Sequence, residues 1–237
     1  MILALNTSTP QFGLALLRWD GSVLCEYSAG AHRRHFSTLM PVLDRLVRLS
    51  GRPVSALEAV VLATGPGSFT GLRVGAALAK GLVHGLGIPL VGVNSLEALA
   101  LQLPMAGRPV RAILDSRKGE VFTALFQPSF AGGVKRLEED YCLVYEKIPM
   151  LGSEGAVFIG NDYPSQARIL CSILGQDVCL APSRLWIPGA SAVGQIGLTR
   201  LLNNDADDPV NLTPAYYRPP DIRPNSIPAS DPLPSAL

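Results

Sequence analysis

The chain has 237 residues, enough to bury one large hydrophobic core or two smaller ones. Charged residues make up only 16%, and a formal net charge of +1 argues against an extended nucleic-acid-binding surface. Average proteins have about 25% charged residues, so the low share fits either a subunit interface or a compact surface of small residues.

The four cysteines show no C-x-x-C pair and no metal-finger spacing. The first residues have no basic segment of the kind that begins a signal peptide, and no stretch reaches about 18 uncharged apolar residues. We therefore expect a cytoplasmic protein with reduced thiols and no membrane association.

The chain is predicted to begin with three strands joined by polar turns, at residues 2–5, 12–17 and 22–28. Residues 36–49 carry apolar side chains at the i, i+3, i+4, i+7 spacing of a helix, which ends before Gly51 and Pro53. The apolar stripe of this helix spans about half its circumference, wider than packing on one sheet requires.

A buried strand is predicted at residues 57–63, and it leads through a glycine-rich segment into a second helix that ends near Gly85. Residues 87–93 form the next strand, followed by a helix capped by Asn94 or Ser95. Residues 104–109, which begin and end with proline, are the candidate hinge.

The strand pattern then restarts, with strands at residues 110–115, 120–126, 135–144 and 156–160 and a helix at 190–202. The repetition predicts two α/β lobes of a duplicated βββαβα type, covering residues 1–104 and 105–218, with a cleft between them. The final helix could pack back on the first lobe. The Pro- and Ser-rich tail, residues 219–237, is expected to be disordered.

The segment Gly65-Pro-Gly-Ser-Phe-Thr-Gly71 joins a strand to a helix N-terminus, where free N–H groups and the helix dipole favour an anion. It matches neither a Walker A loop, nor G-x-G-x-x-G, nor a nucleophile elbow. It is either a weak phosphate site or a tight structural turn. The candidate nucleotide or phosphate contacts are Asn6, Thr7, Gly65, Gly67, Ser68 and Thr70.

Residues 65–75 resemble the glycine signature of the TsaB (YeaZ) family, and segments 5–9, 92–97, 115–122 and 214–218 agree with it. The second of its motifs contains Asp115, Arg117, Gly119 and Glu120. The resemblance covers about residues 1–218 and implies a two-lobed actin-like/sugar-kinase (ASKHA) fold. It also implies a non-catalytic subunit that pairs with the catalytic TsaD and works with the ATPase TsaE in making threonylcarbamoyladenosine next to the tRNA anticodon.

Three positions argue against independent ATP hydrolysis. The fold's ATPases need an acidic residue in the first strand–turn, and this chain has Asn6. The second phosphate hairpin, residues 115–118, carries bulky side chains, and the adenosine-binding Gly-Gly is reduced to Gly160-Asn161. We expect no tightly bound cofactor and at most weak ATP or ADP binding, alone or at a complex interface.

Two enzymatic alternatives stay open: an ATP-dependent kinase of the same fold and a metalloprotease. The catalytic paralogue has an H-x-x-x-H pair, whereas His32 and His35 are one residue too close for it and His84 is the remaining histidine. A zinc site needs at least three protein ligands, so no metal site is predicted.

The second helix carries small residues where charged ones are expected. Ala77, Gly81 and Gly85 lie four residues apart, and each glycine costs an exposed helix about 1 kcal/mol relative to alanine. The glycines either loosen a helix end or let a partner helix approach. The predicted interface combines this face with the first helix: Leu39, Val42, Leu46, Leu49, Arg73, Val74, Ala77, Lys80, Gly81, His84 and Gly85. The expected occupant is the TsaD-like subunit, or a second copy when that subunit is absent, with tRNA contacted indirectly.

Overall fold

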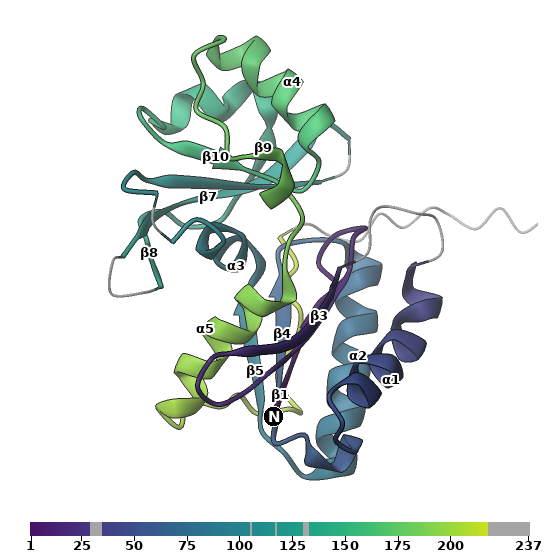
Figure 1. Cartoon of the computed structure of the whole chain (residues 1–237). Coiled ribbons are helices and arrows are strands. Elements are labelled where there is room, and N and C mark those ends of the chain that lie inside the picture. The colour runs from purple at the N-terminus through teal and green to yellow at the C-terminus, as the bar shows by residue number, and fades with distance from the viewer. Residues whose placement is uncertain (29–34, 105, 117, 130–132, 218–237) are drawn as a thin grey trace, which may run out of the picture.

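The computed structural model describes residues 1–237 except 29–34, 105, 117, 130–132 and 218–237. The described residues form two α/β lobes, stacked one above the other in Figure 1. The elements of the first lobe are β1 (Ile2–Asn6), β2 (Gly13–Leu17), β3 (Val23–Ser28), η1 (His35–Thr38), α1 (Leu39–Leu49), η2 (Val54–Ala56), β4 (Ala59–Gly65), α2 (Phe69–Leu86), β5 (Leu90–Asn94) and α3 (Ser95–Leu101). The elements that follow are β6 (Val110–Asp115), β7 (Glu120–Pro128), β8 (Val134–Arg136), β9 (Tyr141–Val144), η3 (Tyr145–Leu151), β10 (Val157–Ile159), α4 (Tyr163–Leu174), η4 (Ser183–Leu185) and α5 (Ala190–Leu202).

The first sheet has the order β3-β2-β1-β4-β5, with β1, β4 and β5 parallel and β2 and β3 antiparallel. Strands β1, β2 and β4 are almost entirely buried because helices cover both faces of the sheet, whereas the edge strand β3 is largely exposed. Figure 1 shows α1 and α2 on one face of this sheet and α5 on the other. Leu3 and Leu5 pack in one core cluster with residues of α1 and α2, whereas Ile2 and Ala4 pack with residues of α5. The carboxyl ends of the three parallel strands, and the turns that follow them, therefore meet at the edge nearest the second lobe.

The second sheet repeats this plan. β6 pairs with β7 antiparallel and with β10 parallel, as β1 pairs with β2 and β4, and β8 and β9 share the position of β3 along the edge of β7. A parallel bridge between Phe158 and Leu180 marks the place of β5. The predicted duplicated α/β architecture is confirmed.

Several elements differ from the prediction. The strand expected at residues 135–144 is split into β8 and β9, and α4 and η3 were not predicted. α3 lies between the lobes, because Leu96 and Leu99 belong to the core of the second lobe while Ala98 packs on the first sheet. The final helix α5 packs back on the first sheet through Ala190, Val193 and Leu198, which is the position that the sequence allowed for it and is not a difference.

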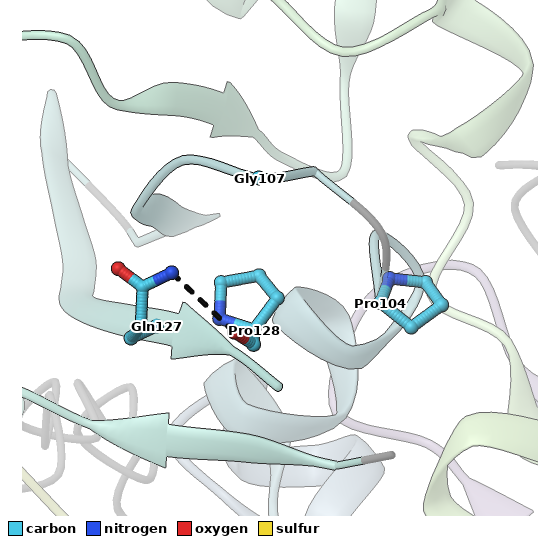
Figure 2. Close-up of a pocket in the computed structure, with 4 residues that line it drawn as sticks. All are labelled: Pro104, Gly107, Gln127 and Pro128. Carbon is cyan, nitrogen blue, oxygen red and sulfur yellow. Dashed lines mark hydrogen bonds between the residues drawn. The ribbon is translucent and has the colours of Figure 1, made fainter. Parts of the chain in front are cut away.

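The connection at residues 104–109 borders a hollow of about 40 Å³ lined by Pro104, Gly107, Gln127 and Pro128. In Figure 2 the side-chain amide nitrogen of Gln127 points toward Pro128, and it donates to the Pro128 carbonyl oxygen at 3.3 Å. A space of this size holds a few water molecules at most. None of the helices in the described part of the chain is both long and apolar enough to cross a bilayer.

Candidate functional site

The turn after β1 is buried inside the molecule. Asn6, Thr7, Ser8 and Thr9 are each at most 3% exposed. The Asn6 side-chain oxygen accepts from the backbone N–H of Ser8 at 3.2 Å and its hydroxyl at 2.7 Å, while the Asn6 amide donates to the Pro188 carbonyl at 3.4 Å. Asn6 therefore serves as both donor and acceptor within the fold, a combination that an ionised aspartate cannot provide.

The glycine signature packs directly on this turn. A Cβ atom on Gly67 would lie 2.1 Å from the Ser8 carbonyl oxygen, and one on Gly71 would lie 2.0 Å from that of Thr7. The Ser68 N–H donates to the Ser8 carbonyl at 2.6 Å, and the Ser68 hydroxyl caps α2 by accepting from Gly71 N–H. These contacts favour the structural-turn interpretation of the segment, since its backbone faces the chain itself.

The second lobe closes over the same turn. The Gln11 side-chain amide donates to the carbonyl oxygen of Asn161 at 2.7 Å, across the lobes. The Asn161 side chain is buried and accepts from the Asp115 N–H at 2.8 Å. Gly160 lies under Trp186, whose ring would be 2.7 Å from an added Cβ. The positions expected to take adenosine and phosphate thus bind one another; we call residues 6–11, 65–68, 115 and 160–161 the interlobe junction.

Two acidic side chains, Asp115 and Asp162, lie close together at the junction. Partial burial raises the pKa of Asp115, and the neighbouring charge of Asp162 raises it further. Burial also raises the pKa of Tyr145, which contacts Asp115, to about 12. Two carboxylates here disfavour an incoming phosphate. Of the remaining motif residues, Gly119 and Glu120 lie where the hairpin that follows Asp115 enters β7. Arg117 lies outside the described residues.

The opposite side of α2 faces solvent. Arg73, Ala77, Gly81, His84 and Gly85 are exposed, and we call them the outer face of α2. A Cβ atom added at Gly81 or Gly85 would meet nothing within 4 Å. Thr70 is also exposed, whereas Lys80 is partly buried. Val74 packs on the core of the first lobe, so it contributes less to the outer face than predicted.

The interface prediction for α1 was wrong at two residues. Leu39 and Leu46 are 2% and 4% exposed and belong to the core, because α1 packs on β2 and β3 through this stripe. Val42 is partly buried. Leu49 is 67% exposed, and so, at 58%, is Met40, which the sequence reasoning did not include.

Sequence reasoning also missed the segment after α5, residues 205–217, which we call the strap. It runs beside α2 and ends on the second lobe. The Tyr216 ring lies 5.2 Å from that of Phe69, and its hydroxyl accepts from Arg73 at 3.1 Å. The Tyr217 hydroxyl donates to Asp140 at 2.7 Å. The only sequence signal for the strap was the resemblance to the family at residues 214–218, and it did not predict what these residues contact.

Among the described side chains, no three His, Cys, Asp or Glu residues come together as metal ligands. His84 lies on the outer face of α2, and His32 and the side chain of His35 fall outside the description.

The chain is similar in sequence to proteins of known families. A family model described as TsaD, tRNA N6-adenosine threonylcarbamoyltransferase, matches residues 29–149. The tRNA threonylcarbamoyladenosine biosynthesis protein TsaB of Bacillus subtilis is 30% identical over 219 residues, covering 92% of this chain and 93% of that protein. TsaB of Haemophilus influenzae is 28% identical over 230 residues, with the same two coverages.

Solved structures show the same fold. YeaZ from Pseudomonas aeruginosa superimposes with a TM-score of 0.75 at 23% identity, covering 90% of this chain and 99% of that one. The activator of the 2-hydroxyisocaproyl-CoA dehydratase from Clostridium difficile does so with a TM-score of 0.52 at 7% identity, covering 86% and 97%. The described lobes therefore have the actin-like/sugar-kinase fold, and the chain belongs to the TsaB (YeaZ) family.

Proposed function

We propose that this chain is a non-catalytic subunit in the biosynthesis of threonylcarbamoyladenosine in tRNA. It pairs with a TsaD-like catalytic subunit and helps to recruit a TsaE-like ATPase, in the cytoplasm. The names of the Bacillus and Haemophilus relatives support the pathway, since this chain spans 93% of each.

The observation that carries the proposal is the packing of the turn after β1. An ATPase of this fold would present that turn to the nucleotide, with an acidic side chain holding Mg²⁺-bound phosphate. Here Asn6 is neutral and 1% exposed, and Gln11 ties the turn to Asn161 of the other lobe. The chemistry accordingly resides in the partner. Nucleotide contact by this chain is at most weak, or is completed at the interface with the partner.

The outer face of α2 is where the partner docks. Ala77, Gly81 and Gly85 present no side chain beyond a methyl group, so the backbone of a partner helix can come close. Burial of this row in a complex would offset the cost of about 1 kcal/mol for each helical glycine. A paralogous subunit of the same fold has a corresponding helix to offer, and a second copy of this chain takes that place when the paralogue is absent. Contact with tRNA is indirect, in line with a net charge of +1.

The experiment is a reconstituted threonylcarbamoyl-transfer assay with the paralogous catalytic subunit and the ATPase, with and without this chain. We expect transfer to require the chain, and the double variant Ala77→Arg/Gly81→Arg to lose both co-purification and transfer. The variant should fold, since both positions are exposed and space above Gly81 is open.

Gln195→Arg/Thr199→Arg is the matched control, because it adds the same two charges at exposed positions four residues apart on α5, which covers the opposite face of the sheet. It should leave pairing and transfer unchanged. Full pairing by the double variant would remove α2 as the docking face. ATP turnover by the chain alone with Mg²⁺ would favour the kinase alternative, and stoichiometric metal in the purified chain would revive the protease alternative.

A further inference from the structure

The strap is hydrogen-bonded to the first lobe at several points before it reaches the second lobe. At its start, the Asp207 N–H donates to the Leu90 carbonyl at 2.8 Å, and the Asp207 carboxylate accepts from Gly92 N–H at 2.7 Å. Further along, the Lys80 ammonium donates to the Val210 carbonyl at 3.2 Å, and the Ala215 N–H donates to the Thr64 carbonyl at 2.8 Å. The strap therefore lies alongside α2, from Lys80 back to its N-terminal turn.

Two consecutive tyrosines at the end of the strap hold different lobes. Tyr216 accepts from Arg73, whose guanidinium lies 4.0 Å from the centre of the Phe69 ring. Tyr217 donates to Asp140 and places its ring 6.2 Å from that of Phe122 in the second sheet. Because the two residues are adjacent, releasing one loosens the backbone that positions the other.

Asp140 lies where the lobes meet. Its carboxylate accepts from the Asn94 side chain at 2.6 Å and also pairs with Arg136. Asn94 in turn caps α3, the helix between the lobes, by accepting from Leu96 and Glu97 N–H groups. Burial, together with the hydrogen bond to Asp140, raises the pKa of Tyr217 to about 12, so the hydroxyl keeps its proton and donates at neutral pH.

Through Tyr217 and Tyr216, these contacts extend from Asp140 to Arg73 on the outer face of α2. Arg73 belongs to that face, and the Tyr216 ring beside it is 46% exposed. The strap thus extends the surface on which, under the proposed function, the paralogous subunit sits. Whatever displaces or clamps Arg73 also acts on Tyr216.

We propose that the strap couples the outer face of α2 to the second lobe. Tyr216 responds to partner binding through its contact with Arg73, and Tyr217 transmits the change through its hydrogen bond to Asp140. The partner's identity rests on the proposed function, whereas the coupling is a property of this chain alone. The coupling is reciprocal: weakening the Tyr217–Asp140 bond changes affinity at a face that Tyr217 is not part of.

The first test uses the isolated full chain. Arg73→Met, Tyr217→Phe and the double variant are unfolded in urea. Each single change should lower the folded-to-unfolded ratio about fivefold, as expected for one partly exposed hydrogen bond. The double variant should lose little more than either one, because either change already frees the last two residues of the strap, Tyr216 and Tyr217. Strictly multiplicative effects would overturn the proposal.

The control pair is Arg48→Met and Tyr141→Phe. Arg48 is exposed and pairs with Asp44 on α1, and Tyr141 is 40% exposed on β9. Their effects should multiply independently.

The second test is a titration with the purified paralogous subunit. Tyr217→Phe should change the dissociation constant about threefold or more, and Tyr141→Phe should not. Equal affinities for wild type and Tyr217→Phe would contradict the proposal. If the paralogue does not bind wild type at all, the proposed function fails, and the unfolding cycle still decides whether the strap couples the two lobes.

Discussion

Two pairs of glycines on one helix have opposite reasons to be there. Gly71 and Gly75 face inward at the start of α2, where an added Cβ would come within 2.0 Å of the Thr7 carbonyl oxygen and 2.2 Å of the Thr7 hydroxyl. Gly81 and Gly85 face solvent, with nothing within 4 Å. The inner pair is required by the fold, whereas the outer pair costs stability without a contact inside the chain.

This difference separates the interlobe junction from the outer face of α2. At the junction, the candidate phosphate-binding residues pack against other parts of the chain and form hydrogen bonds within it. On the outer face, the described structure gives the small residues no neighbour. The family signature therefore encodes a closed junction in its first half, and its second half leads into a surface suited to another protein.

The largest expected effect comes from filling the inner pair. Gly71→Ala should lower the free energy of unfolding by about 3 kcal/mol, because the methyl group meets backbone that cannot move without shifting the turn. Urea unfolding of the isolated chain measures this change. A loss below that of an ordinary surface substitution would mean that the turn is not packed as described.

Restoring an acidic residue at the junction should also cost stability. Asn6→Asp places a carboxylate against the Pro188 carbonyl and loses the amide donor, at about 2 kcal/mol. It should not create ATP turnover, because the turn stays buried. A variant that hydrolysed ATP with Mg²⁺ at an enzyme-like rate would show that Asn6 alone had silenced an otherwise functional site.

Filling the outer pair should have a smaller effect and the opposite sign. Gly81→Ala should stabilise the isolated chain by about 1 kcal/mol, through helix propensity alone. The same methyl group should weaken binding of the paralogous subunit about tenfold by holding the partner helix away. Thermal unfolding and a binding titration on one preparation test both halves; a gain in stability with unchanged affinity would count against this face.

The smallest effect concerns pH. Burial raises the pKa of Glu97, on α3 between the lobes, above its usual 4.5. The folded chain therefore holds this proton to a higher pH than the unfolded chain does. The group's contribution to stability is complete below pH 4.5 and is lost as the pH rises through the folded pKa.

Glu97→Gln should accordingly raise the melting temperature by about 2 °C at neutral pH and hardly at all in acid. Melting curves of wild type and Glu97→Gln from acid to neutral pH test this prediction. A gain confined to acid would reverse the sign of the assigned shift.

Local patterns predicted much of the fold. The helical period gave α2 and α5 closely, and the same spacing placed Ala77, Gly81 and Gly85 on a side of α2 that is indeed exposed. The prediction for α1 failed at Leu39 and Leu46 because periodicity gives the width of an apolar stripe but not which part of it faces the sheet. α4 was missed because the turn residues around Asp162 and Pro164 obscured its start.

The remaining errors concern contacts distant in sequence. Gln11 and Asn161 are 150 residues apart, and no local pattern indicates that one donates to the other. The strap has neither a helical nor a strand period, so its path along α2 depends on single bonds such as those of Lys80 and Arg73. Side chains that look like ligands on local grounds can therefore be internal partners.

The most direct test of the account is the affinity of the purified paralogous subunit for three preparations: wild type, Ala77→Arg/Gly81→Arg, and Asn6→Ala. We predict one-to-one binding that falls at least a hundredfold with the arginine variant and changes less than threefold with the junction variant. The reverse order, with binding insensitive to the outer face and abolished at the junction, would contradict it.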